Sequence, residues 1–387
     1  MNQEQKIICR IVGAALLGGE IPACDVSDWK EIHQEFVDQT ILAIPGTILK
    51  QLPMPQEIFK QWKFEMITGS ARSIRLMDDQ NELVRLLEQQ TIPYVILKGV
   101  AAAKYYPEPW LRTMGDVDLI VPQGYFDQTK QLMLQNGFAA TDDDQEGNRH
   151  AAFAHNGVHY ELHRYFSITE DDAGRKLDEI VYQGIENSTE TQIMNYAFRT
   201  LPEPVNGIVL LAHIRQHLSS GLGLRQMADW FMFVRQELHD EQWPAFRQMS
   251  DQIGLTQLAK TATRIGQLYF GLDESISWCN DVDAVICEDL MDHIFRSGNF
   301  GHKDVDNSSA VFAMTRLRQH FFRTLQKNGE RNWKALKKHA WLKPFAWLYQ
   351  LCRYARLGLS SKRIRAKVGE DRAHSRDLAD LMKRLKL

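Results

Sequence analysis

The sequence contains few cysteines and no long hydrophobic run. Five cysteines occur in 387 residues, without a Cys-x-x-Cys pair, at these positions: Cys9, Cys24, Cys279, Cys287 and Cys352. This odd, scattered set argues against a disulfide framework and against a zinc site built from cysteine. No apolar stretch reaches the roughly 18–20 residues that span a bilayer, and no small-residue cleavage site follows the apolar run at 11–17. We therefore expect a cytoplasmic protein.

Low-complexity tracts and internal repeats are also missing, which excludes repeat architectures and long compositionally biased segments. Hydrophobic residues make up 44% of the chain and charged residues 25%, as in an ordinary globular protein. The length suits two or three domains, or one catalytic domain with helical additions.

Charge is unevenly distributed along the chain. The formal net charge is −3, but the residues from Arg316 onward contain 20 Lys and Arg against 5 Asp and Glu. This end therefore carries +15, and the first 315 residues carry −18. Aromatic residues alternate with basic ones between Trp333 and Leu351. We expect this tail to pack on the acidic body of the protein, to lie on an anionic membrane surface, or to contact RNA.

Hydrophobic periodicity predicts how the chain is organised. Apolar residues recur at helical spacing in the first part of the chain, with Ser27 or Asp28 as one N-cap and a long amphipathic stretch over 56–89. From about residue 175 the pattern is again helical as far as the end. These patterns divide the chain into an N-terminal helical region at 1–88, a core at 89–175, a helical domain at 176–300 and a basic, aromatic-rich helical tail at 301–387.

The core has the pattern of short strands. Apolar runs bounded by glycine, proline or polar residues predict strands over 94–97, 116–121, 138–140, 152–154 and 158–163. Two short helices, 100–106 and 126–136, are predicted between them. The fold class is therefore α+β, a small mixed sheet flanked by N-terminal and C-terminal helical regions.

The first predicted strand ends at Lys98-Gly99, and a helix follows. Glycine permits a tight turn and lets backbone N–H groups approach an anion, toward which the helix directs its positive end. Such junctions are common as plain turns. This one indicates a phosphate cradle only in combination with other features.

Two acids, Asp116 and Asp118, begin the strand over 116–121. Residues two apart on a strand project from one face, so both carboxylates point the same way while Val117 and Leu119 face the core. Two like charges side by side are costly unless a cation neutralises them. Mg²⁺ commonly takes one or two carboxylates together with substrate phosphate oxygens. A pair of solvated acids is the simpler alternative.

The strand over 158–163 alternates strictly. Its apolar residues share one face, and His159, Glu161 and His163 share the other. Glu161 supplies the third carboxylate that a two-metal site for phosphoryl transfer needs. An alternating strand alone would be unremarkable, but it follows a glycine turn and a pair of acids.

Together these motifs resemble the DNA polymerase β-type nucleotidyltransferase superfamily, and more narrowly its uncharacterised bacterial nucleotidyltransferase family. Members of that family pair an LKG turn with a later arginine and a G-D-[IV]-D-L strand, all of which occur here within 95–121. Further similar pieces are Glu161-Leu-His163, His213…His217…Gly223-Leu-Arg225…Asp229 and Gly298-Asn-Phe-Gly301. The resemblance covers about residues 1 to 302. A similar arrangement occurs in abortive-infection toxin nucleotidyltransferases, so the substrate does not follow from it.

The resemblance implies that Asp116, Asp118 and Glu161 bind Mg²⁺ (or Mn²⁺) and act as the catalytic acids, with Gly99 against the triphosphate. Many superfamily members have Ser or Gly after this glycine, whereas this chain has Val100, which offers no hydroxyl to the phosphate. Lys98 either compensates as a phosphate cation or pairs with an aspartate.

Four more side chains are candidates for the site. Arg112 would clamp phosphate or orient the carboxylates, and Arg225 would reach the nucleotide from the helical domain. His163 would support Glu161 or touch substrate. His213 and His217 lie four apart on a predicted helix, and we expect them to pack and to hydrogen bond with Arg225 or Asp229 rather than to bind zinc.

The predicted function is Mg²⁺-dependent transfer of a nucleoside monophosphate from an NTP, such as ATP, to an unidentified acceptor hydroxyl by a two-metal mechanism. The acceptor is a small molecule, a saccharide, RNA or protein. One alternative is a catalytically idle nucleotide-binding or interaction protein, and another is a toxin-like enzyme that modifies tRNA. We expect a cytoplasmic enzyme, with or without peripheral contact at the inner membrane face through the basic tail.

Overall fold

The computed structural model describes residues 1–21, 28–141, 149–218, 220–299, 303, 326, 329, 333, 340–359 and 377–387. These residues form two compact units, one comprising Met1–Phe300 with Leu385–Leu387 and the other Gly301–Arg384. Ser27, the acidic loop at 142–148 and most of the basic tail lie outside the described residues.

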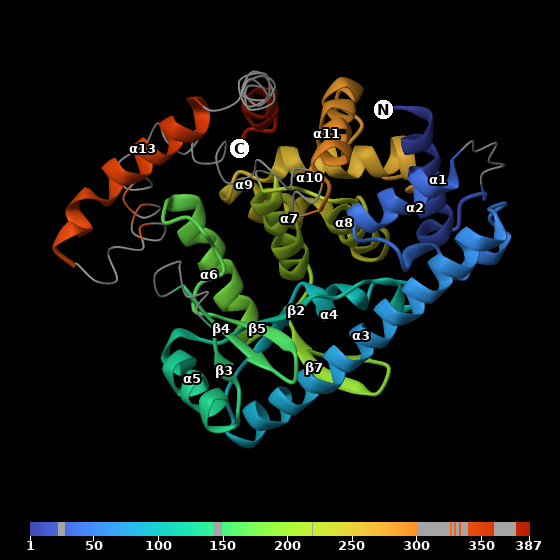
Figure 1. Cartoon of the computed structure of the whole chain (residues 1–387). Helices are drawn as coiled ribbons and strands as arrows, with labels where there is room; N and C mark the ends of the chain where they lie inside the picture. Colours follow the sequence, from blue (N-terminus) through green and yellow to red (C-terminus); the bar gives the residue numbers. More distant parts are fainter. Residues whose placement is uncertain are drawn as a thin grey trace. The chain divides into compact units, whose positions relative to one another are not determined.

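A mixed sheet of five strands, in the order β1-β2-β5-β4-β3, lies at one end of the first unit (Figure 1). The strands are β1 (Val95–Leu97), β2 (Asp116–Ile120), β3 (Ala139–Ala140), β4 (His150–His155) and β5 (Val158–His163). The two central strands, β2 and β5, run parallel, and all other neighbours pair antiparallel. The predicted small mixed sheet between helical regions is confirmed.

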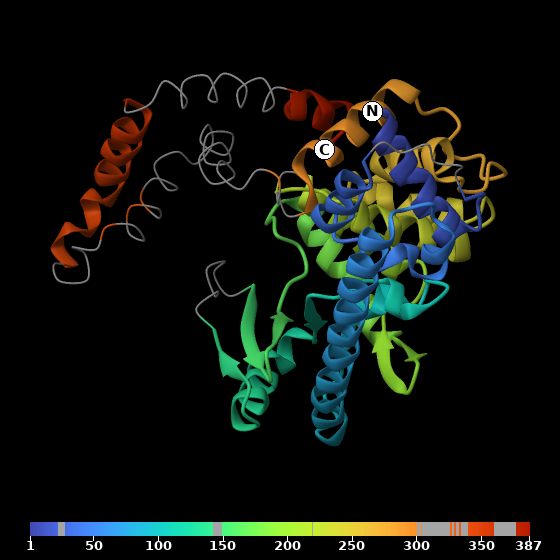
Figure 2. The ribbon, with the colours of Figure 1, turned by 45° about the vertical axis from the view of Figure 1, so that its right-hand side comes forward.

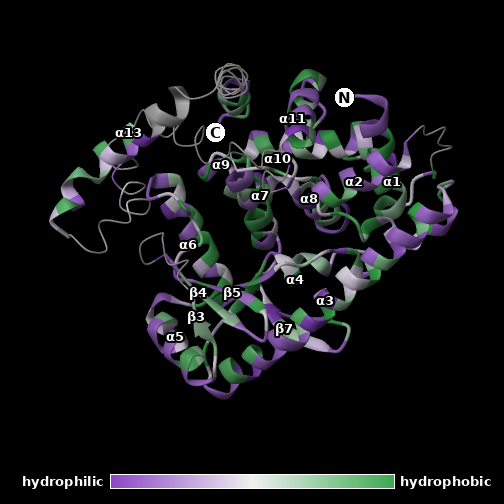
Figure 3. Ribbon diagram, viewed as in Figure 1, coloured by the Kyte–Doolittle hydropathy of each residue, from purple (hydrophilic) through white to green (hydrophobic). Residues whose placement is uncertain are grey.

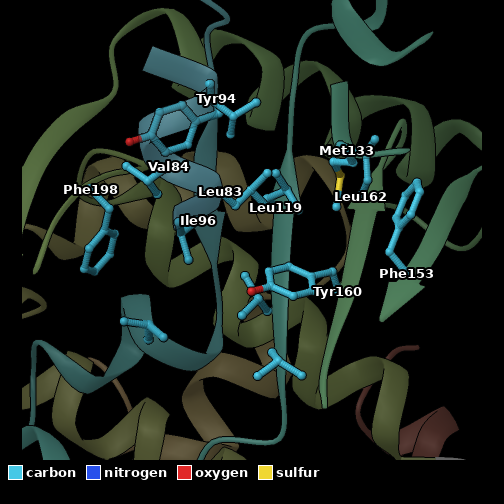
Figure 4. Close-up of a cluster of buried hydrophobic side chains, with 14 of the residues drawn as sticks. Leu83, Val84, Tyr94, Ile96, Leu119, Met133, Phe153, Tyr160, Leu162 and Phe198 are labelled. Atoms are coloured by element: carbon cyan, nitrogen blue, oxygen red, sulfur yellow. The ribbon is translucent and has the colours of Figure 1, made fainter. Parts of the chain in front are cut away.

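One face of this sheet is the hydrophobic core. Alternate residues of β1, β2 and β5 enter it, including Ile96, Leu119 and Tyr160. The 34-residue helix α3 (Gln56–Gln89) covers this face with Leu83, Val84 and neighbouring apolar residues (Figures 2 and 4). Because side chains alternate along a strand, the polar residues of the same strands are left on the opposite face.

Most of the other helices of the first unit pack on one another in a cluster beside the sheet (Figure 1). The predicted amphipathic stretch is α3, with the predicted bounds, and Asp28 is the N-cap of α2 because its carboxylate accepts from the backbone N–H groups of Lys30 and Glu31. The α-helices are α1 (Gln3–Leu17), α2 (Trp29–Asp38), α4 (Gly99–Ala103), α5 (Phe126–Gln135), α6 (Asp172–Glu186), α7 (Val205–His217), α8 (Leu224–Glu237), α9 (Trp243–Gln252), α10 (Thr256–Ile265) and α11 (Ala284–Ser297). The 3₁₀ helices and one π-helical turn are η1 (Ile44–Thr47), η2 (Leu49–Gln51), η3 (Pro109–Leu111), η4 (Gln123–Tyr125) and η5 (Gly266–Phe270, the π-helical turn).

The prediction that the chain is helical from about residue 175 to its end is wrong at one place. A hairpin of β6 (Thr189–Ile193) and β7 (Tyr196–Thr200) forms a separate two-stranded sheet. Its alternating apolar residues Ile193 and Phe198 join the core beside α3. Thr, Tyr and Phe favour strands, and the short length of each strand concealed this signal between two long helices.

The second unit contains η8 (Ala340–Phe345) and α13 (Ala346–Leu359). Hydrophobic and hydrophilic residues both appear along α13 in Figure 3. Trp341, Phe345, Leu348 and Leu351 are exposed, while Ala346 is buried. Within the described part of the chain, no helix is both long and apolar enough to span a membrane.

Candidate active site

The face of the sheet opposite the core carries the predicted acids. Asp118 pairs in register with Glu161 on the neighbouring parallel strand, and Asp116 pairs with His159. Residues in register on adjacent strands lie on the same face, so Asp118 and Glu161 project together. The sheet therefore brings together three acids that lie up to 45 positions apart in the sequence.

Asp118, Glu161 and His163 converge most closely. One potential ligand atom from each lies within 4.8 Å of those of the other two. His163 Nε2 is 2.9 Å from Asp118 Oδ1 and 3.4 Å from Glu161 Oε2. Asp118 is only 4% exposed and His163 7%, whereas Glu161 is partly exposed and Asp116 is exposed at the start of β2. Carboxylate oxygens and an imidazole nitrogen at this separation suit a divalent cation.

Lys98 completes this group from the end of β1. Its Nζ donates to Asp118 Oδ1 at 3.1 Å and lies 5.6 Å from the centre of the Phe166 ring. The predicted pairing of Lys98 with an aspartate is present, and its contact with phosphate stays a prediction. The left-handed backbone at this turn falls on Lys98, with φ 49°, and not on Gly99.

Gly99 is not required by packing. A Cβ at this position would make ordinary contacts, 3.5 Å from the Asp116 carbonyl oxygen and 3.9 Å from Arg112 Nη1. The helix that follows, α4, has five residues, and so short a helix has only a weak dipole. An anion here would therefore depend mainly on cationic side chains.

The surroundings of the acids shift their pKa values in opposite directions, upward for Asp116 and downward for Asp118 and Glu161. The surrounding protein desolvates Asp116, and Asp118 repels it, which raises the pKa of Asp116 to about 6. Burial alone would raise the pKa of Asp118, but Lys98 and the hydrogen bond with His163 outweigh it and hold this pKa well below its usual value. The hydrogen bond with His163 likewise lowers the pKa of Glu161.

The same acids raise the pKa of the two basic side chains, Lys98 and His163. Burial opposes the charge of Lys98 and of His163, yet the pKa of each is raised. For Lys98 the nearby charges of Asp118, Glu161 and Asp116 outweigh burial. For His163 the hydrogen bonds to Asp118 and Glu161 do so. The group therefore balances much of its own negative charge.

Arg112 lies directly behind the Gly99 turn and is held by Asp229 of α8. Its Nε and Nη2 donate to the two carboxylate oxygens of Asp229 at 3.1 and 2.8 Å, and Nη1 donates to the Thr113 carbonyl oxygen. Tyr106 adds a third hydrogen bond to Asp229, at 2.8 Å. Both charged side chains are at least 97% buried. This pairing ties the sheet to the helical part, and a role of Arg112 in nucleotide binding stays a prediction.

Arg112→Lys should lower the free energy of unfolding by about 2–3 kcal/mol, because lysine cannot make the two-pronged pair with the buried Asp229. Urea unfolding measures this change. Arg175→Lys is the matched control, since Arg175 and Asp172 pair in solvent and the exchange there should cost less than about 0.5 kcal/mol. Equal costs at the two positions would show that the buried pair does not tie the sheet to the helical part of the first unit.

Arg225 adds a second buried guanidinium beside this pair. Its Nη1 donates to the Thr113 carbonyl oxygen at 3.4 Å. Burial and the nearby charge of Arg112 lower the pKa of Arg225 to about 10, although Asp229 opposes the shift. Arg225 thus adds a second buried positive charge near Arg112, Asp229 and Asp116.

His213 and His217 contact each other. Their Nε2 atoms are 2.9 Å apart at the end of α7. Burial, reinforced by Lys98, lowers the pKa of His213 well below its usual value and that of His217 to about 4. Among the described residues, neither belongs to a group of three ligands that could share an ion. The mutual contact agrees with the predicted packing, and the expectation that they do not bind zinc stays a prediction.

Sequence patterns did not indicate a second polar group, formed by Asp79, Glu82 and His155 on the α3 side of the sheet. Asp79 accepts hydrogen bonds from Tyr160 and Asn156 at 2.6 and 2.7 Å and contacts His155 Nδ1 at 3.1 Å. Its carboxylate is therefore already satisfied by the protein and ties α3 to the β4–β5 turn. Only the long-range pairing of α3 with this turn could have revealed it.

Comparisons with known proteins give one match. A family model described as uncharacterised nucleotidyltransferase matches residues 25–271. No curated protein and no solved structure matches the chain. The matched range begins later and ends earlier than the predicted 1–302, but it contains the whole sheet, α7 and α8, and hence every residue predicted for the site.

Proposed function

Because the chain belongs to the uncharacterised nucleotidyltransferase family, we propose that it transfers a nucleoside monophosphate from an NTP to an acceptor hydroxyl. The proposal places Asp116, Asp118 and Glu161 as the ligands of Mg²⁺ or Mn²⁺ on a sheet of the polymerase β type. The observation that carries it is the convergence of Asp118 and Glu161 from two parallel strands, beside Asp116 and on the face away from the core.

The donor atoms fit a hard divalent cation, because carboxylate oxygens predominate. When bound, such cations neutralise phosphate charge and lower the pKa of an acceptor hydroxyl. The protein's own part is positioning: the strands fix Asp116, Asp118 and Glu161 on a rigid sheet, and rigid placement of the reacting groups is a large part of phosphoryl-transfer catalysis. Glu161, the most accessible of the close group, is placed to accept the acceptor's proton.

Lys98 and Arg225 are proposed to hold the triphosphate next to Gly99. Lys98 Nζ lies at the acids, 3.1 Å from Asp118 Oδ1, and Arg225 adds a buried positive charge near Asp116. Gly99, without a side chain, leaves room for the phosphate against the backbone. The positive charge for the phosphate would therefore come from Lys98 and Arg225, because the five-residue helix α4 has only a weak dipole.

Arg225→Met should weaken NTP binding about tenfold, because a charge-assisted hydrogen bond to phosphate is lost. The measurement is the rise in melting temperature produced by each NTP with Mg²⁺. Arg199→Met on the exposed β6–β7 hairpin is the control and should leave that rise unchanged. If Arg225→Met retains the full NTP-dependent rise, Arg225 does not touch the nucleotide.

The proposed activity is tested with purified protein, cell extract, Mg²⁺ or Mn²⁺, and each of the four NTPs labelled at the α-phosphate. The expected result is label attached to an acceptor, with none transferred from γ-labelled NTP. Stabilisation by NTP without any incorporation would favour the idle nucleotide-binding alternative. Label recovered in tRNA would identify the toxin-like alternative.

We also propose that the second unit contacts an anionic lipid surface. Trp341 and Phe345 are 71% and 51% exposed, and Leu348 follows three residues later on the adjoining helix. Arg353 is exposed on the same helix, and the segment from Arg316 onward carries +15. An apolar stripe within a strongly basic segment is typical of helices that lie in the membrane interface.

Trp341→Ser with Phe345→Ser should reduce binding to vesicles of phosphatidylcholine and phosphatidylglycerol about tenfold or more, because two large apolar side chains no longer enter the lipid. Co-sedimentation measures this binding. Phe64→Ser on α3, which removes a phenylalanine of the first unit that is 71% exposed, as Trp341 is, is the control. Unchanged vesicle binding, or binding to tRNA alone, would contradict the lipid assignment.

A further inference from the structure

The closest group of ligand atoms at the acidic site includes a nitrogen. Among the described residues, the atoms that converge within 4.8 Å come from Asp118, Glu161 and His163, rather than from three carboxylates. His163 follows Glu161 by two positions on β5 and so projects from the same face. Its side chain is 9% exposed, and its Nε2 lies close to both acids.

The distances match those between neighbouring ligands of one ion. Two ligand atoms at right angles on an octahedral ion, each about 2.1 Å from it, lie about 3 Å apart. His163 Nε2 is 2.9 Å from Asp118 Oδ1 and 3.4 Å from Glu161 Oε2. The three side chains could therefore hold one cation with little rearrangement.

His163 Nε2 contacts two acids but carries at most one hydrogen. A neutral imidazole has one N–H, and a single Nε2–H cannot point well at two carboxylates on different strands. Asp118 Oδ1 also accepts from Lys98 Nζ at 3.1 Å, so a cation bound here would share that oxygen with the ammonium group or displace it. At the acidic site the nitrogen completes a ligand set of two oxygens and one nitrogen.

We infer that His163 is a direct ligand of the cation at this site and that the site therefore selects Mn²⁺, or another transition metal, over Mg²⁺. This inference rests on the proposed function, which supplies the cation. Mg²⁺ takes oxygen ligands almost exclusively, whereas imidazole suits transition metals. The three acids alone would accept either Mg²⁺ or Mn²⁺, whereas His163 favours Mn²⁺ or another transition metal.

The experiment is pulsed electron paramagnetic resonance of the full-length protein with one equivalent of Mn²⁺. Imidazole coordination predicts a ¹⁴N modulation in the wild-type signal. His163→Gln should remove this modulation, and should lower the ratio of Mn²⁺ affinity to Mg²⁺ affinity about tenfold, as judged by competition. His159→Gln is the matched control, because His159 is exposed on the same face of β5 and belongs to no ligand group among the described residues.

The outcomes separate this inference from the function beneath it. Bound Mn²⁺ without ¹⁴N modulation in the wild type would overturn the nitrogen ligand and leave the three acids as the metal site. Equal loss of Mn²⁺ and Mg²⁺ binding in His163→Gln would also overturn it, since His163 would then only position the acids. If the wild-type protein binds neither cation, the proposed metal site itself is wrong. The wild-type spectrum decides these cases even if His163→Gln fails to fold.

Discussion

Asp116→Asn is expected to reduce nucleotidyl transfer by about 100-fold or more and at the same time to raise the melting temperature. Activity falls because a proposed metal ligand loses its charge. Stability rises because desolvation and the repulsion of Asp118 make the charged form of Asp116 unfavourable, which raises its pKa to about 6. A charged side chain that destabilises the folded state and lies on the same face as the proposed site is typical of a functional position.

The pH dependence of this gain follows from the direction of the shift. An acid with a raised pKa stabilises the folded state when it is protonated, and that stabilisation is lost as the pH rises from its ordinary value of 3.8 to about 6. Asparagine should therefore increase stability above pH 6 and have little effect below pH 4. Since Asp116 is exposed, solvent weakens this effect, and we expect the free energy of unfolding to increase by only about 1 kcal/mol. This increase corresponds to a rise of about 2 °C in the melting temperature.

Calorimetry of the wild type and of Asp116→Asn across this pH range measures the gain. A lower melting temperature at pH 7 would contradict the electrostatic account of Asp116. Unchanged transfer activity would contradict its role as a metal ligand, whatever the melting temperature. The two readouts are therefore independent.

Asp118→Asn should also abolish transfer, but it should lower the free energy of unfolding by about 3 kcal/mol. Asp118 is buried and accepts hydrogen bonds from Lys98 and His163 through one oxygen. Its pKa is depressed, so its charge stabilises the fold above its ordinary pKa, and this contribution is lost only on acidification. Asparagine leaves the buried Lys98 ammonium without its nearest counter-charge.

A double variant separates the charge pair from the chemistry. Asp118→Asn with Lys98→Met removes both charges, so it should recover much of the stability that Asp118→Asn loses while remaining inactive. Urea unfolding and the labelled-NTP assay are the two measurements. If the double variant loses more free energy of unfolding than the two single variants lose together, the Lys98–Asp118 pair is not the source of the loss.

Much of the site could be predicted because strand alternation is a local property. The apolar residues at every second position fix which face of β2 and β5 enters the core, and hence place Asp118 and Glu161 on the other face. The bounds of β5 and of α3 agree with the prediction for the same reason, since strict periodicity of 2 or 3.6 residues is visible in a single sequence.

The remaining features depend on contacts between distant parts of the chain. Arg112 meets Asp229 across 117 positions, and no periodicity reveals such a pairing. The sequence leaves Lys98 undecided between phosphate and aspartate, because the choice depends on the register of β1 against β2, where Leu97 lies opposite Asp118. The β6–β7 hairpin was missed because strands of five residues give a weak signal next to long helices.

The most direct test of the central claim is anomalous diffraction from crystals grown with Mn²⁺ and a non-hydrolysable NTP analogue. The account predicts anomalous density about 2.1 Å from the carboxylate oxygens of Asp116, Asp118 and Glu161, with the phosphates on the Gly99 side. Manganese ordered only at the Asp79–Glu82–His155 group, or acids that remain without manganese while the nucleotide is bound, would contradict it.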